Sequence, residues 1–364
     1  MVGNHDVELY WPSVQRMLCD ALGAPIPPNI GEDEDDQPVV FCNWFYLSGG
    51  DTYVSHGHQY DPNCVVRDPI DPLIEVRGKP RVRIPFGDLA ARYMLNGMGY
   101  FNPHQSENYI MSAVSYLRFF FRYMLRTQPL LIWTWFWGAY ATLLISLRTH
   151  WAPPMTDPLL VDDKVRSVAM RSQATPSMVR KLNALHVPSA TNNPFRIARE
   201  LWLDRAFFLL VALFLSWQVV LHINIAWPIS PLWVFVPALI FMLPYAAYAS
   251  SVRPTVFETP LLTERLAELI FKITGARRVV FGHTHQPVCE QVGPVTLYNG
   301  GFWSKAFADP ECTIRLGEQT FVWIRPGREG EGRTAELCEW KATESSPVRA
   351  LAAEGVRQPE MQPA

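Results

Sequence analysis

A nine-residue stretch near the carboxyl end decides the fold of this chain: Arg277-Arg278-Val279-Val280-Phe281-Gly282-His283-Thr284-His285. Its apolar, β-branched part predicts a strand, which Gly282 ends. Histidines that follow a strand lie at its carboxyl end, where open α/β sheets bind their ligands. The stretch therefore predicts an α/β protein with a functional site at this sheet edge.

Two other short motifs carry the same kind of side chain. Gly3-Asn4-His5-Asp6 begins the chain, and His56-Gly57-His58 follows a predicted strand at 52–55. Asparagine and histidine are neutral ligands for divalent transition metals. We therefore expect one metal site assembled from segments that lie far apart in the sequence.

The hydrophobic pattern divides the chain into a split α/β domain with a long insertion. Residues 1–64 and 276–340 carry the strand patterns, 65–275 form the insertion, and 341–364 have the composition of a disordered tail. Strands are predicted in both halves of the domain, at Val39–Leu47, Thr52–Ser55, 277–281, 295–298, 312–316, 319–325 and 335–340. A helix over about 7–22, capped by Asn4 or Asp6, would bury Val7, Trp11, Val14, Leu18 and Leu22.

The first part of the insertion is basic. Arg77, Lys79, Arg81 and Arg83 alternate with other residues in an extended pattern. Helices are predicted further on, at Leu89–Leu95 and at Tyr109–Arg126, and the second of these is amphipathic. The basic residues could contact a substrate phosphate or anionic lipid headgroups, or could simply protect a solvated edge strand.

The overall composition excludes some classes of function. Apolar residues make up 49% of the chain and charged residues 18%, with a net charge of −2. No basic domain is present, which argues against a nucleic-acid partner. The six cysteines have no Cys-x-x-Cys spacing, which favours reduced thiols on a cytoplasmic face.

Three apolar stretches, at 127–147, 206–224 and 231–250, are long enough to span a bilayer. Because the motifs before and after them must meet on one side of the membrane, only two can cross. The segment 148–205 carries nine Lys or Arg residues against five Asp or Glu, which places it on the cytoplasmic side. We therefore expect a membrane hairpin at 206–250, although buried or dimerising helices of a soluble protein would show the same composition.

The remaining stretch, 127–147, would then be re-entrant, interfacial or buried against the hairpin. Its aromatic cluster is typical of the headgroup level, and comprises Trp133, Trp135, Phe136, Trp137 and Tyr140.

The three motifs in this order resemble those of the calcineurin-like metallophosphoesterase superfamily. Gly-His-Thr-His followed by Pro287 and then by Asn299-Gly300-Gly301-Phe302-Trp303 is also similar to the branch that contains UDP-2,3-diacylglucosamine pyrophosphatases. That branch inserts a helical lid at the corresponding place. The resemblance implies a four-layer α/β/β/α sandwich, here incomplete and with a partly transmembrane insertion.

The resemblance also implies roles for individual residues. Asn4, His56 and His283 would bind one metal, and His285 would reach a second, the pair being Mn²⁺, Fe²⁺ or Zn²⁺. A hydroxide activated by these metals would attack phosphorus. His5 would protonate the leaving group, and Asp6 would orient the His5 ring. His58 would lie near the substrate or would be a satisfied loop residue. Arg77 and Arg81 are substrate-binding candidates on the basic pattern alone, not on the resemblance.

The family pattern also has Asp-x-His and Gly-Asp-x-x-Asp motifs before Gly-Asn-His-Asp. Only Met1 and Val2 precede that motif here, and neither carboxylate motif occurs elsewhere in the chain. We expect a truncated record of a longer enzyme, with weak metal binding and impaired activity in the chain as it stands.

These observations favour a membrane-associated phosphoesterase acting on a phosphorylated small molecule or a lipid. The main alternative is an inactive, membrane-anchored pseudoenzyme or scaffold. A channel or transporter is disfavoured, because His222 is the one ionisable side chain in the apolar stretches.

Overall fold

The structure is a computed structural model. It describes residues 1–24, 39–96, 130–155, 157–252, 262–303, 319–327 and 332–341, with short pieces at 121, 306–307, 315–316 and 348–350. The acidic loop at 31–36, almost all of the helix predicted at 109–126, and most of the tail lie outside the described residues.

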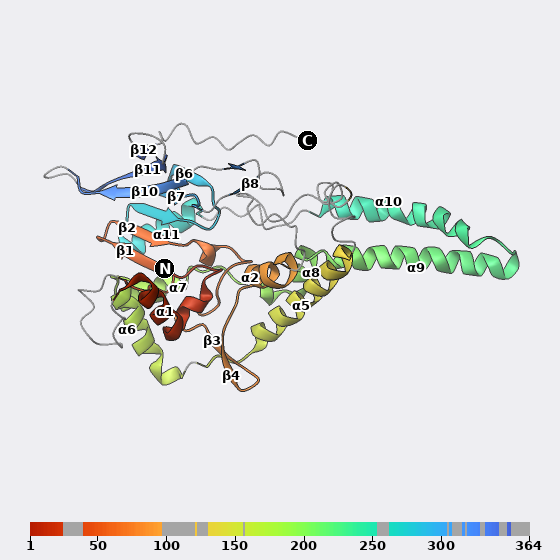
Figure 1. The fold of residues 1–364 in the computed structure, drawn as a ribbon, viewed down its shortest axis with the longest axis horizontal. Coiled ribbons are helices and arrows are strands. Elements are labelled where there is room, and N and C mark those ends of the chain that lie inside the picture. The colour runs from red at the N-terminus through yellow and green to blue at the C-terminus, as the bar shows by residue number, and fades with distance from the viewer. Residues whose placement is uncertain are drawn as a thin grey trace.

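A five-stranded mixed sheet forms the centre of the α/β body, in the order β1-β2-β5-β7-β6 (Figure 1). Its strands are β1 (Phe45–Ser48), β2 (Thr52–Ser55), β5 (Arg278–Phe281), β6 (Pro287–Val292) and β7 (Val295–Gly300). β2, β5 and β7 run parallel, whereas the edge strands β1 and β6 are antiparallel to their neighbours. The predicted α/β class is thus confirmed at this level.

The register of the parallel strands brings the sequence motifs together. Val54 pairs with Val280, and Phe281 pairs with Asn299. His56 and Gly282 therefore follow adjacent strands at one sheet edge, next to the end of β7.

Three helices cover one face of this sheet: α6 (Val161–Arg171), α7 (Pro176–Asn183) and α11 (Glu264–Thr274). Their apolar side chains share one buried core with the strands. This core includes Trp44, Phe45, Tyr53, Val168, Leu182, Ile270, Val279 and Phe281. Continuous apolar runs such as Val279–Phe281 suit strands that are covered in this way.

A second, three-stranded sheet packs at the β6–β7 end of the first. Its strands are β10 (Gln319–Arg325), β11 (Thr334–Trp340) and β12 (Val348–Ala350), and a separate pair is formed by β8 (Ala306–Phe307) and β9 (Arg315–Leu316). The hydroxyl of Tyr298 donates to the carbonyl oxygen of Ala335 at 3.2 Å, and Thr320 Oγ1 donates to that of Gly300 at 2.8 Å. These bonds hold the two sheets together.

The helix predicted over 7–22 is wrong in its bounds and in its buried face. A 3₁₀ turn, η1 (Val7–Tyr10), is followed by a break at Trp11 and then by α1 (Pro12–Leu22). Pro12 has no amide hydrogen, and is suited to the first turn of a new helix rather than to the interior of a longer one. Neither Asn4 nor Asp6 caps α1. Leu18 and Leu22 are exposed, and Cys19 is the buried residue of the helix.

The insertion begins with a two-stranded hairpin, β3 (Leu73–Val76) and β4 (Lys79–Val82), and continues into α2 (Phe86–Leu89) and a wide π-type turn, η3 (Ala90–Leu95). Further along lie α5 (Leu131–Trp151), η6 (Pro158–Leu160), η7 (Ala190–Asn192) and α8 (Pro194–Glu200). A small core joins α2, η3, α5 and α8, with Phe86, Met94, Ala139, Ile197 and Leu201 buried. These helices lie between the five-stranded sheet and the two long helices that follow residue 202 (Figure 1).

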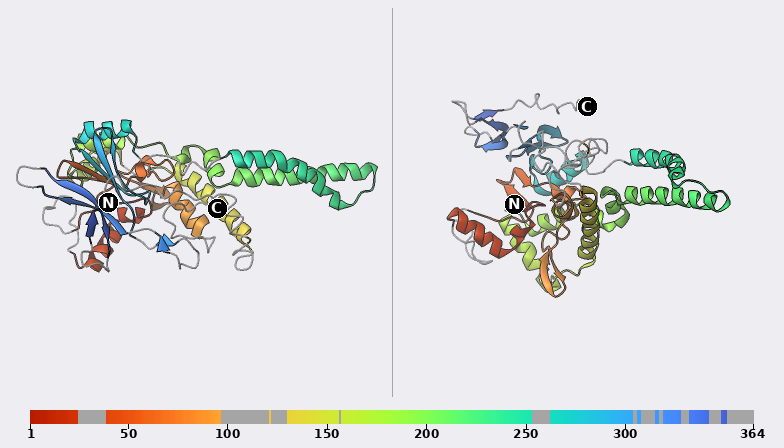
Figure 2. Two further views of the ribbon diagram at one scale, coloured as in Figure 1. Left: turned by 90° about the horizontal axis from the view of Figure 1, so that it is seen from above. Right: turned by 45° about the vertical axis from the view of Figure 1, so that its right-hand side comes forward.

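Two helices are long and apolar enough to span a membrane, with α9 covering Leu203–Ala226 and η8–α10 covering Pro231–Ser251. They project side by side, well away from the body (Figures 1 and 2). Only 17% of the apolar window in α9 is buried, and none of that in α10. Core helices of soluble proteins are mostly buried, so this exposure is unusual for them.

Polar contacts close the base of this helical pair. The guanidinium of Arg205 donates to the carbonyl oxygen of Val252 at 2.9 Å and to that of Arg199 at 3.1 Å. The hydroxyl of Tyr248 donates to Asp204 at 2.6 Å. The start of α9 and the end of α10 are thereby joined next to the body.

Helix α5 lies along the body rather than in the projecting pair. Ala139, Thr142 and Ser146 face inward and are fully buried. Its outward face is apolar and aromatic, with Trp133, Phe136, Trp137, Tyr140 and Leu144 exposed. The first apolar stretch therefore packs one face against the body and leaves the other face exposed.

Candidate metal centre

Two histidines approach each other where β2 and β5 end. The amide of Gly282 donates to the carbonyl oxygen of His56 at 3.1 Å, which joins the two motif loops directly. The rings of His56 and His283 lie 5.3 Å apart between centroids. The structure therefore brings together two residues that are more than 200 positions apart in the sequence.

The loop that carries His283 and His285 has an unusual backbone. Both residues have positive φ angles, 65° and 60°. Such conformations of non-glycine residues cost about 1–3 kcal/mol each and concentrate at functional sites. The other motif obtains its turn from Gly57, which has a φ of 98°.

Asn299 braces this strained loop. Its side-chain amide donates to the carbonyl oxygen of Gly282 and to Thr284 Oγ1, each at 2.8 Å. Its oxygen accepts from the amide of Gly301 at 3.0 Å. Sequence reasoning quoted Asn299 only for the resemblance and missed this role, although a polar residue ending an apolar strand was a usable signal.

Asn4 is buried, and it follows Gly3, which lies against the His56 ring. Its side chain has 1% exposure, and neither amide atom has a hydrogen-bond partner among the described residues. A Cβ atom on the preceding Gly3 would lie 3.0 Å from the His56 ring, so Gly3 lets the backbone approach that ring closely. A buried polar group without a partner is costly, and a ligand that satisfies it is a common reason for its presence.

The electrostatic environment confirms that the histidines share one neighbourhood. Burial, followed by the charges of His283, His285 and His5, lowers the pKa of His56 to about 3. Burial followed by His283 and His5 also lowers the pKa of His285. These imidazoles are kept neutral, which is the form that binds metals.

His58 lies deeper than predicted for a substrate-binding residue. It is completely buried, its ring centroid lies 5.1 Å from that of His56, and neither ring nitrogen has a hydrogen-bond partner among the described residues. Burial is the main cause of its strongly lowered pKa.

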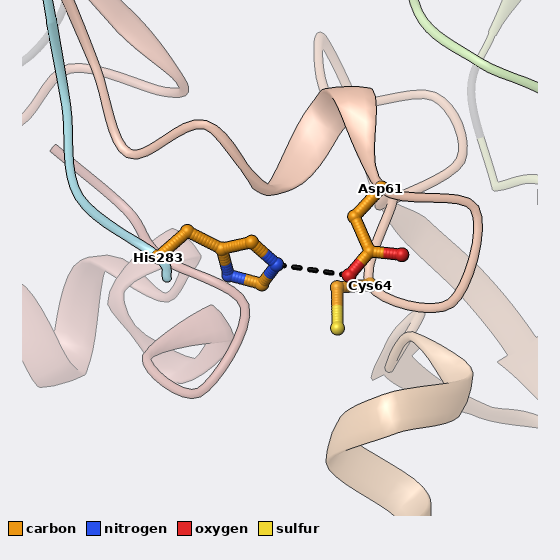
Figure 3. Close-up of side chains that lie close together, drawn as sticks. All are labelled: Asp61, Cys64 and His283. Atoms are coloured by element: carbon orange, nitrogen blue, oxygen red, sulfur yellow. Dashed lines mark hydrogen bonds and ion pairs between the residues drawn. The ribbon is translucent and has the colours of Figure 1, made fainter. Parts of the chain in front are cut away.

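A buried carboxylate holds His283 from behind (Figure 3). Asp61 Oδ2 lies 3.0 Å from His283 Nε2, which leaves Nδ1 as the nitrogen free to bind an ion. Burial alone would raise the pKa of Asp61, but the hydrogen bond and charge of His283 bring it below its ordinary value. A carboxylate in this position fixes the tautomer and orientation of a metal-binding histidine.

Cys64 completes a compact trio with these two residues. Within the described part of the chain, Asp61, Cys64 and His283 are the group whose possible ligand atoms all lie within 4.8 Å of one another. Burial, followed by the charge of Asp61, raises the pKa of the Cys64 thiol well above its ordinary value. Sequence reasoning did not include Cys64, which follows the His-Gly-His motif by only a few residues.

The partner expected for His5 is wrong. His5 Nδ1 lies 2.9 Å from Asp88 Oδ1, in α2, and Asp6 makes no described contact with the His5 ring. Asp6 lies instead next to Gly3, with a carboxylate oxygen 2.9 Å from where a Gly3 Cβ would be. The His5 side chain is 51% exposed, so the ring is open to a substrate.

Arg77 and Arg81 stand apart from this centre. Both are exposed, Arg77 at the turn of the β3–β4 hairpin and Arg81 on β4. None of the hydrogen bonds or ion pairs between described residues joins either arginine to the histidines. Their predicted contact with substrate gains no support from the geometry.

No protein-family model matches this chain, and no curated protein or solved structure shows significant similarity to it.

Proposed function

We propose that this protein is a metal-dependent hydrolase attached to a membrane. More specifically, we propose a phosphoesterase of the calcineurin-like type, which cleaves a phosphate ester or pyrophosphate of a small molecule or lipid. The observation that carries the proposal is the approach of His56 and His283 at the carboxyl ends of β2 and β5, where Gly3 lies against the His56 ring. The side-chain amide of the next residue, Asn4, and Nδ1 of His56 are buried without a hydrogen-bond partner among the described residues.

The residues present fit a divalent transition metal. Asn4, His56 and His283 would hold one ion through an amide oxygen and imidazole nitrogens, and His285 would hold a second. Asp61 contacts Nε2 of His283, and Cys64 lies close to both, so these two residues surround the side of the ring that faces away from the ion. When bound, Mn²⁺, Fe²⁺ or Zn²⁺ supplies Lewis-acid activation of water and of the phosphoryl group.

The side chains of the chain itself have separate tasks in this proposal. Asp61 orients His283, and Asn299 fixes the loop on which His283 and His285 lie. The exposed ring of His5 protonates the leaving group at the mouth of the site. The four-layer sandwich that the resemblance implies would have three of its layers here. These are the helices α6, α7 and α11 together, the five-stranded sheet and the three-stranded sheet.

The membrane part of the proposal rests on α9 and α10. Few residues of either apolar window are buried, and the connecting turn at 227–230 has no charge. The excess of basic residues at 148–205 favours a cytoplasmic body with the turn on the opposite side. The exposed aromatic face of α5 would then contact the headgroup region next to the hairpin base.

The test is hydrolysis of bis(p-nitrophenyl) phosphate by detergent-solubilised protein with and without Mn²⁺. It should use the chain of 364 residues and, in parallel, the same chain with any residues that its reading frame encodes before Met1. We expect metal-dependent turnover that His283→Ala abolishes, with the control Lys272→Ala, at an exposed position of α11, unaffected.

Three outcomes separate the alternatives. Turnover that survives His283→Ala would contradict the assigned metal ligands. Metal binding without turnover in either chain would favour the pseudoenzyme or scaffold. Absence of both would remove the hydrolase proposal altogether.

A further inference from the structure

We propose that Asp88, a residue of the inserted segment, positions His5 for proton transfer to the leaving group. This inference rests on the proposed function for its catalytic meaning, whereas the contact itself belongs to the structure. It gives the insertion a direct part in the chemistry, and not only in membrane attachment.

The contact between Asp88 and His5 has the geometry of a directed hydrogen bond. Nδ1 of the ring and Oδ1 of the carboxylate are 2.9 Å apart. The Asp88 side chain is 3% exposed, whereas that of His5 is 51% exposed. One side of the ring is thus fixed from within the protein, and the remainder of the ring faces outward.

The hydrogen bond to Asp88 determines which nitrogen of the neutral His5 ring carries the proton. An ionised carboxylate can only accept hydrogen bonds, so Nδ1 must donate its hydrogen to Oδ1. In neutral His5 the other nitrogen, Nε2, is then bare and able to take up a proton. In protonated His5 that nitrogen can deliver its proton outward while Nδ1 keeps its bond to Asp88.

A second ion pair holds the Asp88 carboxylate in place. Arg92 Nε lies 2.8 Å from Asp88 Oδ2, and the two terminal nitrogens of Arg92 donate to the Glu8 carboxylate at 2.7 and 3.1 Å. Glu8 belongs to the same amino-terminal segment as His5. One guanidinium therefore connects two carboxylates and fixes α2 and η3 onto residues 5–8.

The placement of Asp88 connects the site to the base of the membrane pair. Phe86, in the same short helix, lies in a core with Ala139 of α5 and Ile197 of α8, and Leu203 of α9 packs against this core. One layer of helices thus separates the His5 ring from the point where α9 leaves the body.

The direct test is the tautomer of His5, observed by ¹⁵N NMR of histidine-labelled full-length chain in detergent micelles without added metal. Spectra are taken at about pH 8.5, two units above the ordinary imidazole pKa of about 6.5. The His5 resonances are assigned by their loss in His5→Gln. We expect a proton on Nδ1 in the unmodified protein and a mixture of tautomers in Asp88→Asn.

Asp71→Asn is the matched control. Asp71 is another buried carboxylate, paired with Lys164, and its pair lies outside the His5 contacts. This variant should leave the His5 tautomer unchanged. If the unmodified protein carries its proton on Nε2, or if Asp88→Asn leaves the tautomer unchanged, the proposal is wrong. The first of these outcomes decides the matter even where Asp88→Asn fails to fold.

Leaving-group dependence tests the catalytic meaning separately. A p-nitrophenolate leaving group needs little protonation, whereas an alkoxide needs it strongly. General acids contribute about 10²–10⁴-fold, so Asp88→Asn should lower kcat about 10²-fold for an alkyl phosphodiester and only a few-fold for the aryl ester. Equal losses for both substrates would show a structural role only. If no form of the protein hydrolyses either substrate, the proposed function fails while the NMR result still decides the Asp88–His5 contact.

Discussion

The side-chain amide of Asn299 donates a 2.8 Å hydrogen bond to the carbonyl oxygen of Gly282, the first residue of the strained histidine loop. Asn299 is 4% exposed, and its partner is the residue just before His283. The bond joins β7 to the residue that follows β5, its parallel neighbour. It therefore fixes the position of the loop relative to the sheet.

Asn299→Ala should destabilise the fold and weaken metal binding together. Loss of buried hydrogen bonds costs about 1–3 kcal/mol where a partner is left unsatisfied. Urea unfolding should show this loss, and calorimetric titration with Mn²⁺ should show a lower affinity. Gln291→Ala, on the exposed side of β6, should change stability by less than about 0.5 kcal/mol. Unchanged metal affinity in Asn299→Ala would remove its bracing role.

Gly301→Ala should be more destabilising than Gly50→Ala. Both glycines have positive φ angles, 67° and 71°, so both substitutions introduce backbone strain. A Cβ on Gly301 would also lie 2.3 Å from Thr320 Oγ1, whereas one on Gly50 would meet nothing within 4 Å. We expect an extra loss of about 1–3 kcal/mol at Gly301 from overpacking. Thermal or urea unfolding of the two variants tests this difference, and equal losses would contradict the packing observed around Gly301.

Buried neutral histidines should make the protein sensitive to acid. Burial lowers the pKa of both His56 and His186 to about 3. The unfolded chain binds protons at these sites below about pH 6.5 while the folded chain does not, so stability falls as the pH drops from about 6.5 toward 3.

His186→Phe removes one of the two histidines whose protonation opposes folding. Because His186 is not a proposed metal ligand, the variant tests the pH dependence of stability separately from metal binding. The slope of unfolding free energy against pH should decrease by at most about 1.4 kcal/mol per pH unit between pH 6 and 4. The unfolding free energy of variant and parent should be measured at several pH values in that interval. An unchanged slope would mean that His186 is protonated in the folded protein.

The direction in which the membrane pair crosses can be tested with single introduced cysteines. Ser230 lies in the turn between α9 and α10, and Ser177 lies in α7, both at exposed positions. The two variants are Ser230→Cys and Ser177→Cys. An impermeant maleimide applied to sealed vesicles should label only one of the two introduced cysteines. In inverted vesicles it should label only the other. Labelling of both from the same side would exclude a membrane-crossing pair.

The aromatic face of α5 should lie at the bilayer surface. An environment-sensitive dye on Trp133→Cys, whose native side chain is 60% exposed, should shift to the blue when the protein enters liposomes. The same dye on Ser177→Cys should show no shift. If neither position responds, α5 faces water.

Local patterns predicted several strands because these strands have a strong signal within a few residues. The pattern failed for β6 (Pro287–Val292), which was not predicted, and for Val39–Leu47, where the strand begins only at Phe45. Thr52–Ser55 was predicted with the bounds of β2, and 319–325 with those of β10. The metal-ligand motifs were also local, and their meeting followed from parallel strand order. The helix at 7–22 was wrong because the effect of Pro12 was overlooked.

Contacts between segments that are far apart in the sequence could not be predicted from such local patterns. The partner of His5 is 83 positions away, in a four-residue helix with no distinguishing pattern, whereas Asp6 is adjacent in sequence. Nor does any sequence period indicate that Cys64 approaches His283, or that Arg77 and Arg81 turn away from the site. These features depend on how the insertion packs, which pairwise spacing does not encode.

The pairing of β2 with β5 has a consequence for biosynthesis. Thr52 and Arg278, which meet across these strands, are separated by 226 positions that include both projecting helices. As the ribosome makes the chain from its amino terminus, α9 and α10 emerge before β5 exists. The five-stranded sheet is therefore completed only after both apolar helices have been synthesised.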